Sequence, residues 1–276
     1  MKNNKLAAIV CFFSLIVMPP VAVSDIAASG QTVTIFVDDA YQPYSFKNAA
    51  GEAQGVYIDI LKTAFSRMPE YSVKLEPVPW KRGKLLMEKG EGLGLAPAFF
   101  HGHDWPYLYP YSLPISDEKI ISVCHASVLN KPRSNWPNDY IGLRVGNVAG
   151  FDGWGGDVFY DLVHQGKIAY EEAKGSVESI IKLGLGRVQC IMMEENAFDQ
   201  EYSKLIMNGE YDQEKFHSLK KGAFVGMDPV YIGYSKKAIQ SGDYPFHLEF
   251  RQAFDTVIYK MTKSGEIREM MQRSLD

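Results

Sequence analysis

The sequence predicts an α/β protein with two lobes. Short β-rich runs alternate with helical patterns in two successive series, which is typical of helices layered on mostly parallel sheets. A turn rich in Pro and Asn at residues 132–138 separates the two series. The chain has 276 residues, of which 46% are hydrophobic, and this is enough for one large core or two medium ones.

The first series starts with a β-rich run at residues 33–37 that is too short for a helix, followed by an aromatic loop at residues 41–46. Between Gly55 and residue 68, apolar residues then recur at helical spacing. The remaining expected elements are a strand at 72–77, a helix at 81–89 that ends at Gly90, and a short strand at 93–96.

The second series repeats the alternation after an expected strand at residues 119–125. Its elements are a strand at 142–146, a helix at 159–165, a strand at 169–172, a helix at 177–185 and a strand at 188–194. Residues 246–274 close the chain with a long amphipathic helical pattern that is interrupted near Ser264 and Gly265.

The connection at residues 96–116 has an unusual composition. It holds six aromatic residues, four prolines and two histidines, but no lysine or arginine. Because each proline lacks a backbone donor and disfavours helical geometry in the residue before it, a continuous helix is excluded. The rings, among them Phe99 and Trp105, either pack beneath this connection as a small core or line a pocket.

The N-terminus has the pattern of a secretory signal peptide over residues 1–24. Lys2 and Lys5 precede a twelve-residue apolar run, and prolines and small residues follow it. The run is shorter than the roughly 20 apolar residues that a membrane span requires. We therefore expect an exported protein that resides in the periplasm.

The net charge limits the possible partners, and the cysteines and histidines limit disulfide formation and metal binding. A formal net charge of −4 argues against nucleic acid as a partner. Cys124 and Cys190 both lie in apolar strand-like runs, where they either form a disulfide in an oxidising compartment or stay buried as free thiols. No Cys or His pair has the spacing of metal ligands, so we expect neither a metal nor another cofactor.

Several short motifs, in order, resemble bacterial extracellular solute-binding proteins of family 3, the periplasmic receptors of polar amino-acid ABC transporters. They are YQPYSF at 41–46, GVYID at 55–59, PWKR at 79–82, YSLP at 111–114, GRV at 186–188 and the helical pattern at 250–261 before Ser264 and Gly265. The resemblance spans nearly the whole chain that follows the signal peptide.

This resemblance implies a type II periplasmic-binding-protein fold, in which two mixed sheets flanked by helices are joined by two hinge strands. Lobe 1 would comprise residues 25–116 and 232–276, and lobe 2 residues 117–231. The protein would be a monomer without enzymatic activity. It would bind a small polar solute in the cleft between its lobes and deliver it to the membrane permease of an ABC transporter.

The resemblance also assigns two charged positions in the cleft. Family members hold a ligand carboxylate with an arginine, and that position, seven residues before Ser112, is occupied here by Trp105. An indole has one donor and cannot replace a bidentate guanidinium. The acid that receives a ligand ammonium aligns with Glu194, although an acid at a helix N-terminus would also explain Glu194.

Other expected ligand-binding residues lie on both sides of the cleft. Aromatic rings would line it, although core packing is an alternative for Trp80, and Arg82 would replace the missing arginine unless it is simply solvated. In lobe 2 a glycine-rich loop would offer backbone donors, unless it is a plain turn. The residues expected at the cleft besides Trp105 and Glu194 are Tyr41, Tyr44, Trp80, Arg82, Ala98, Phe99, Asn147, Gly150 and Phe151.

The sequence therefore favours a receptor for an amine or a neutral polar solute over one for a standard amino acid. One alternative is a dehydratase-like enzyme of the same fold, with a cleft carboxylate such as Glu194 as the acid or base. Another is a ligand-sensing module.

Overall fold

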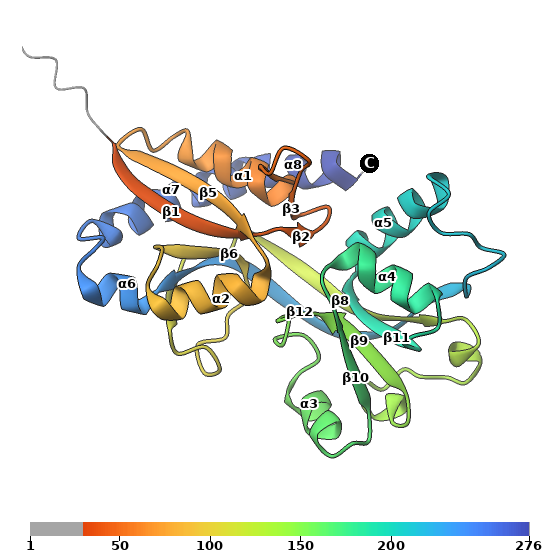
Figure 1. Cartoon of the computed structure of the whole chain (residues 1–276). Coiled ribbons are helices and arrows are strands. Elements are labelled where there is room, and N and C mark those ends of the chain that lie inside the picture. Colours follow the sequence, from red (N-terminus) through yellow and green to blue (C-terminus); the bar gives the residue numbers. More distant parts are fainter. Residues whose placement is uncertain (1–29, 276) are drawn as a thin grey trace, which may run out of the picture.

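The computed structural model describes residues 30–275, which form two lobes connected by long central strands (Figure 1). The expected signal peptide lies outside the described residues. Within residues 30–275, no helix is both long and apolar enough to cross a membrane.

Lobe 1 contains a mixed sheet in the strand order β5-β1-β6-β12, and β7 also pairs with β12. β1 is parallel to β5 and β6, whereas β12 runs antiparallel to β6 and β7. The strands are β1 (Gln31–Asp38), β5 (Tyr71–Val78), β6 (Gly94–Ala98), β7 (Leu108–Tyr111) and β12 (Leu219–Ser235).

Five helices flank this sheet and a small second sheet adjoins it (Figure 1). The helices are α1 (Val56–Phe65), α2 (Trp80–Lys89), α6 (Lys236–Ser241), α7 (His247–Ser264) and α8 (Glu266–Leu275). The small antiparallel sheet consists of β2 (Ala40–Tyr41), β3 (Ser45–Lys47) and β4 (Ala53–Gln54).

Lobe 2 contains a mixed sheet in the order β10-β9-β11-β8-β12. Its strands besides β12 are β8 (Ser116–His125), β9 (Arg144–Val148), β10 (Ala169–Ala173) and β11 (Cys190–Glu194). The helices α3 (Asp157–His164), α4 (Ser176–Gly184) and α5 (Glu195–Met207) accompany this sheet, together with two 3₁₀ turns at Val128–Asn130 and Asn138–Tyr140.

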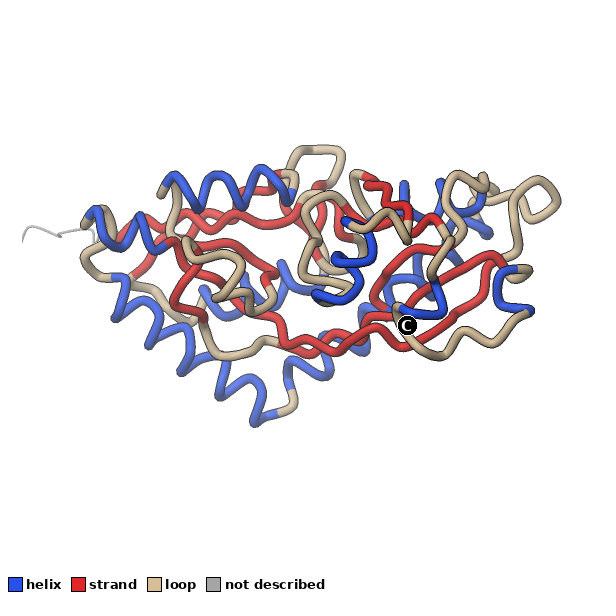
Figure 2. Tube along the Cα trace, turned by 90° about the horizontal axis from the view of Figure 1, so that it is seen from below, coloured by secondary structure: helices blue, strands red, loops and turns tan. Residues whose placement is uncertain are grey.

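The two sheets share β12, which is 17 residues long. Its first part pairs with β8 as far as the Val230–Ser116 pair, and its last part pairs with β6 from Tyr231 onward. Figure 2 shows these long strands passing from one half of the molecule to the other. β8 and β12 are therefore the strands that connect the lobes, as the fold prediction required.

Gly55 positions the aromatic loop of lobe 1. It precedes α1 with φ of 118°, and a Cβ there would clash with the carbonyl of Tyr44. Only glycine combines this backbone geometry with so close an approach. The loop thus lies against the start of α1, where the rings of Tyr44 and Tyr57 stack with their centroids 5.0 Å apart.

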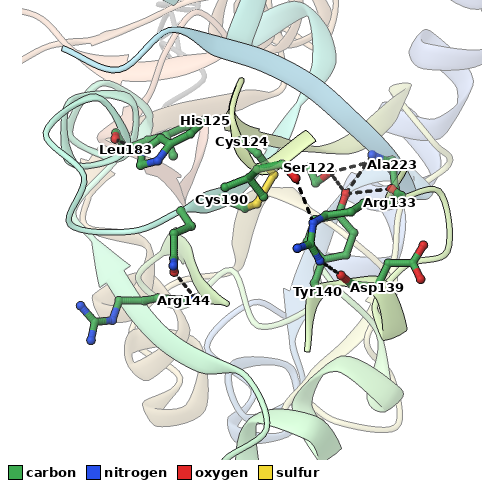
Figure 3. The surroundings of a disulfide bond; sticks show 12 residues. Ser122, Cys124, His125, Arg133, Asp139, Tyr140, Arg144, Leu183, Cys190 and Ala223 are labelled. Carbon is green, nitrogen blue, oxygen red and sulfur yellow. Dashed lines mark hydrogen bonds between the residues drawn. A yellow bond between two sulfur atoms is a disulfide. The ribbon is translucent and has the colours of Figure 1, made fainter. Parts of the chain in front are cut away.

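The cysteine pair forms a disulfide. Cys124 of β8 lies directly opposite Cys190 of the antiparallel strand β11, with 4.0 Å between the two Cα atoms. Figure 3 shows the bridge beside Ser122 and Tyr140, whose hydroxyls are 2.6 Å apart. The sequence left a bridge and free thiols as alternatives, and the structure has the bridge.

Most expected elements are present with shifted ends, and the long C-terminal pattern divides at Gly265 into α7 and α8. The connection at 96–116 contains no helix, as its prolines predicted, but it does include the short strand β7. Helices α5 and α6 were not predicted from the sequence. Their apolar spacing is weak, because only a few of their side chains are buried.

Candidate functional site

An aromatic cavity lies between the lobes. Tyr41, Trp80 and the connection after β6 form one wall, and the loop after β9 forms the other. The cavity is small, with a volume of about 30 Å³, which is room for about two waters. The residues that line it are Tyr41, Trp80, Pro97, Phe99, His101, Trp105, Glu118, Phe151, Gly153 and Trp154.

Five of the expected site residues meet at this cavity, although they come from four separate segments of the sequence. Phe151 lies at the centre of the rings. Its ring centroid is 5.3 Å from that of Tyr41, 5.9 Å from Trp80 and 4.9 Å from Trp154. The expected residues found in the lining are Tyr41, Trp80, Phe99, Trp105 and Phe151.

Glu118 is the acidic residue in the lining, and it is not among the site residues predicted from the sequence. Its side chain is only 1% exposed. The carboxylate accepts hydrogen bonds from the hydroxyls of Tyr41, at 2.6 Å, and Tyr57, at 2.8 Å. Burial, reinforced by the nearby charge of Glu194, raises the pKa of Glu118 to about 8, although both tyrosine hydroxyls lower it.

The alternation of β8 contained a signal for Glu118. In a strand every second side chain points to the same face. Glu118 therefore shares a face with Ile120 and Ser122, which are both buried. An acid in phase with buried positions of a strand is a candidate site residue, because a buried carboxylate requires partners.

Glu194 lies near the cavity without lining it. Its carboxylate caps α5 by accepting a 2.7 Å hydrogen bond from the backbone amide of Ala197. It also accepts a bond from the hydroxyl of Tyr44, at 2.7 Å. Burial raises the pKa of Glu194, and these two bonds lower it. Glu194 thus has the contacts of an acid at a helix N-terminus, which was one of the two roles that the sequence left open.

Trp105 is packed between two basic side chains. The imidazole of His101 lies 4.3 Å from its ring centroid, and the ammonium of Lys84 lies 4.6 Å from it. Lys84 also reaches across the cleft, donating to both oxygens of Asp152 at 2.7 and 2.9 Å and to the carbonyl of Gly150 at 3.0 Å. Lys84, Asp152 and Trp105 therefore form a link between the lobes.

Gly153 permits a second close approach of the lobes. A Cβ at this position would clash with the imidazole of His101. Burial lowers the pKa of His101, so the ring that faces Gly153 tends to be uncharged at neutral pH. The lobes are thus closed on each other in this structure, with side chains of both filling the cleft.

The structure does not bring the other expected residues into the cavity lining. Arg82 is exposed on α2, and Ala98 is buried in β6. Asn147 is fully buried, and its side-chain amide donates to the carbonyl of Phe151, so it stabilises the loop that carries Phe151. Gly150 packs against Trp80, and Tyr44 contacts Glu194 behind the cavity.

The cavity lining, as far as residues 30–275 supply it, contains no lysine or arginine. The described residues also include no cluster of three or more His, Cys, Asp or Glu side chains that could hold a metal ion. The wall thus combines apolar rings with a buried carboxylate and one imidazole. Such a surface is complementary to an organic cation.

The sequence matches no protein-family model and no curated protein. Solved structures do match. One from the glutathione import system of Streptococcus mutans, GshT with the cystine ABC importer TcyBC, has a TM-score of 0.68 at 14% identity and covers 89% of this chain and 95% of that chain. The ancestral amino acid-binding protein AncCDT-1, a precursor of cyclohexadienyl dehydratase, has a TM-score of 0.66 at 16% identity, covering 89% and 96%.

A histidine kinase sensor domain with similarity to periplasmic binding proteins has a TM-score of 0.68 at 12% identity, and the match covers 89% of this chain and 96% of that domain. At such identities the likeness shows the fold and leaves the ligand open. The chain therefore has the two-lobed α/β fold of the periplasmic solute-binding proteins, as its sequence motifs predicted.

Proposed function

We propose that this protein is an exported solute-binding receptor that captures a small organic cation between its lobes. The observation that carries the proposal is Glu118, a buried carboxylate in a cavity whose described lining holds no lysine or arginine. A buried carboxylate without a cationic partner is unfavourable when ionised. A positively charged solute would supply that partner.

The contacts of Glu118 support a binding role. Its two oxygens accept bonds from Tyr41 and Tyr57, which fix the carboxylate in place without neutralising it. A charge-assisted hydrogen bond or ion pair to such an acceptor contributes roughly 1.5–3 kcal/mol. The rings around it would shield the bound cation from water and contact its apolar parts.

Closure of the lobes would bury the solute. Lobe 1, proposed as residues 25–116 and 232–276, contributes Tyr41, Trp80 and Phe99, whereas lobe 2, proposed as residues 117–231, contributes Phe151 and Trp154. In the closed form the space between these rings is too small for a solute of amino-acid size. Entry therefore requires the lobes to separate about β8 and β12, or the rings to part.

The comparisons support transport as the biological context. One structural neighbour belongs to an import system with an ABC importer, and another is an amino acid-binding protein. By analogy, this protein would act as a periplasmic monomer that delivers its solute to the membrane permease of an ABC transporter. We propose binding rather than catalysis. The sensor-domain neighbour supports ligand sensing as a second candidate.

The test is a thermal-shift screen against amines, amino acids, peptides and sugars, followed by calorimetry. Ligand at 100 times its Kd stabilises the folded state by about 2.7 kcal/mol, which raises Tm by roughly 5–10 °C for a protein of this size. We expect cationic solutes to give the largest shifts. If no solute raises Tm and prephenate is instead turned over, the receptor proposal is wrong and the enzymatic alternative replaces it.

A further inference from the structure

The cavity is lined mainly by aromatic side chains. Six aromatic or indole rings other than His101 line or cross it, whereas Glu118 is the carboxylate in the described lining. These two kinds of group recognise cations differently. A carboxylate accepts hydrogen bonds from N–H donors, whereas a ring face attracts positive charge without needing any donor.

A primary ammonium is poorly suited to this wall. It carries three N–H donors, and each donor buried without an acceptor costs about 1–3 kcal/mol. Glu118 already accepts hydroxyl donors from Tyr41 and Tyr57 on its two oxygens, so it has limited capacity for three more. Glu194, the next carboxylate, is bonded to Tyr44, to Asn196 and to the backbone amide of Ala197 in the first turn of α5.

An aromatic wall is better suited to a methylated ammonium. In this closed structure the rings of Tyr41, Trp80 and Trp154 pack edge-to-face against Phe151, with centroid distances of 4.9 to 5.9 Å, so four rings from both lobes meet at one place. A cation is attracted to a ring face when it lies within about 6 Å of the centroid. Phe151 and Trp154 belong to lobe 2, so separation of the lobes would open this ring of side chains for a ligand.

The lack of an unpaired basic side chain in the described lining narrows the ligand class further. Lys84, the basic side chain that contacts Trp105, is already paired with Asp152 and bonded to the carbonyl of Gly150. The described lining therefore offers no free cation to a ligand carboxylate. This favours a cation whose remaining part is neutral over a zwitterion.

We infer that the solute is a methylated ammonium compound, held with its quaternary or tertiary nitrogen among the rings of Tyr41, Trp80, Phe151 and Trp154 and beside Glu118. This inference rests on the proposed receptor function and names its ligand class. The methyl groups bury apolar surface against the rings, and the nitrogen carries few donors or none.

The test compares ethanolamine with its mono-, di- and trimethylated forms, the last being choline, by calorimetry on the exported protein without its signal peptide. All four compounds carry the same hydroxyl and one positive charge at pH 8, so they differ in methyl count. We expect affinity to rise with each methyl group and choline to bind at least tenfold more tightly than ethanolamine. Glycine betaine, which has a carboxylate in place of the hydroxymethyl group of choline, should bind more weakly than choline.

The inference is overturned if ethanolamine binds as tightly as choline or more tightly. If none of the four ethanolamine compounds binds while another solute raises Tm, this inference fails and the receptor function stands. If no solute of any class raises Tm, the receptor function itself fails. The wild-type series decides between these outcomes without any variant.

Ring variants locate the site. Trp80→Leu and Trp154→Leu should each reduce the choline-to-ethanolamine affinity ratio severalfold. The control is Tyr259→Leu, because Tyr259 is a half-exposed ring on α7 that does not line the cavity. Its ratio should equal that of the wild type. An unchanged ratio in both tryptophan variants would contradict the proposed cage.

Discussion

Glu118 and Glu194 are the same residue type in two different settings. Both side chains are 1% exposed, and each accepts a tyrosine hydroxyl. Glu194 is additionally bonded to a backbone amide of α5, so part of its role is to begin that helix. Glu118 lies near the start of β8 with tyrosine hydroxyls as its partners, and it lines the cavity.

Burial alone therefore does not identify a binding carboxylate. A buried acid bonded to a helix N-terminus is explained by the fold, because its charge is stabilised by amide donors. A buried carboxylate that is bonded to hydroxyls beside a cavity lacks a positively charged partner, which a bound cation can supply. Variants at the two positions test this distinction directly.

Ligand affinity should distinguish the two acids most strongly. Glu118→Gln keeps the size and an oxygen acceptor but removes the charge, so we expect affinity for the best cationic ligand to fall roughly 100-fold, as when a buried ion pair is broken. Glu194→Gln should weaken binding severalfold at most, since Glu194 does not line the cavity. Calorimetry on both variants checks this. A greater loss in Glu194→Gln would reverse the assignment.

The next effect is a pH dependence of binding. Because burial raises the pKa of Glu118 to about 8, the free protein holds a proton there at pH 7 that a cation must displace. Affinity should therefore rise about tenfold per pH unit below pH 8 and level off above it. Titration calorimetry at pH 6, 7, 8 and 9 measures this slope.

Other titratable groups near the cavity require a control for that experiment. Burial raises the pKa values of Glu194 and Asp228 and lowers that of His101. Protonation of His101 at low pH would also repel a cation. If Glu118 is responsible, the slope between pH 7 and 8 disappears in Glu118→Gln and persists in His101→Gln.

The third effect concerns stability, where the two acids should differ in sign. Glu194→Ala removes the cap of α5 and should destabilise the fold by about 1 kcal/mol at pH 8. Glu118→Gln should stabilise the unliganded fold at the same pH. Urea unfolding of both variants from pH 4 to 9 tests this.

The sign for Glu118 follows from its raised pKa. Between the ordinary value of 4.5 and about 8, the folded state keeps a proton that the unfolded chain has released. Stability due to this group is therefore full below pH 4.5 and decreases as the pH rises to about 8. In Glu118→Gln, stability should therefore fall less steeply between pH 4.5 and 8 than in the wild type. Some of the decrease should remain, because burial also raises the pKa of Asp38 to about 8. Equal slopes in variant and wild type would contradict the assignment.

The smallest effect is on the link between the lobes. Lys84→Met removes the ion pair with Asp152, whose side chain is 50% exposed, and such pairs contribute about 0–1 kcal/mol. We expect up to a fivefold faster ligand release and a slightly more open solution form. Stopped-flow kinetics and small-angle scattering measure these, with Lys74→Met, an exposed ion pair on β5, as the control.

Much of this architecture was accessible from the sequence, whereas half of the site was not. Periodicity predicted the alternating strands and helices, and prolines predicted an irregular connection at 96–116. Trp80 and Phe151 were predicted through motifs, but the position of Glu118 depends on which face of β8 meets the cavity. That choice is fixed by the pairing of β8 with β12, a contact between segments about one hundred residues apart.

Trp105 shows the same limit. The sequence identified it as the residue in the arginine position, and the structure does place it at the cavity. Its contacts with His101 and Lys84 depend on how the connection folds back onto α2. Local patterns specify which residues are rings, but long-range packing decides which ring faces stay free for a ligand.

The disulfide has a consequence for the distance between the two acids. Cys124 and Glu118 are on β8, and Cys190 and Glu194 are on β11, so one covalent bond joins the strands that carry both carboxylates. A slip of these strands by one residue would turn Glu118 or Glu194 to the opposite side of the sheet. The bridge forbids that slip, so its formation also fixes how the two carboxylates are aligned on the sheet.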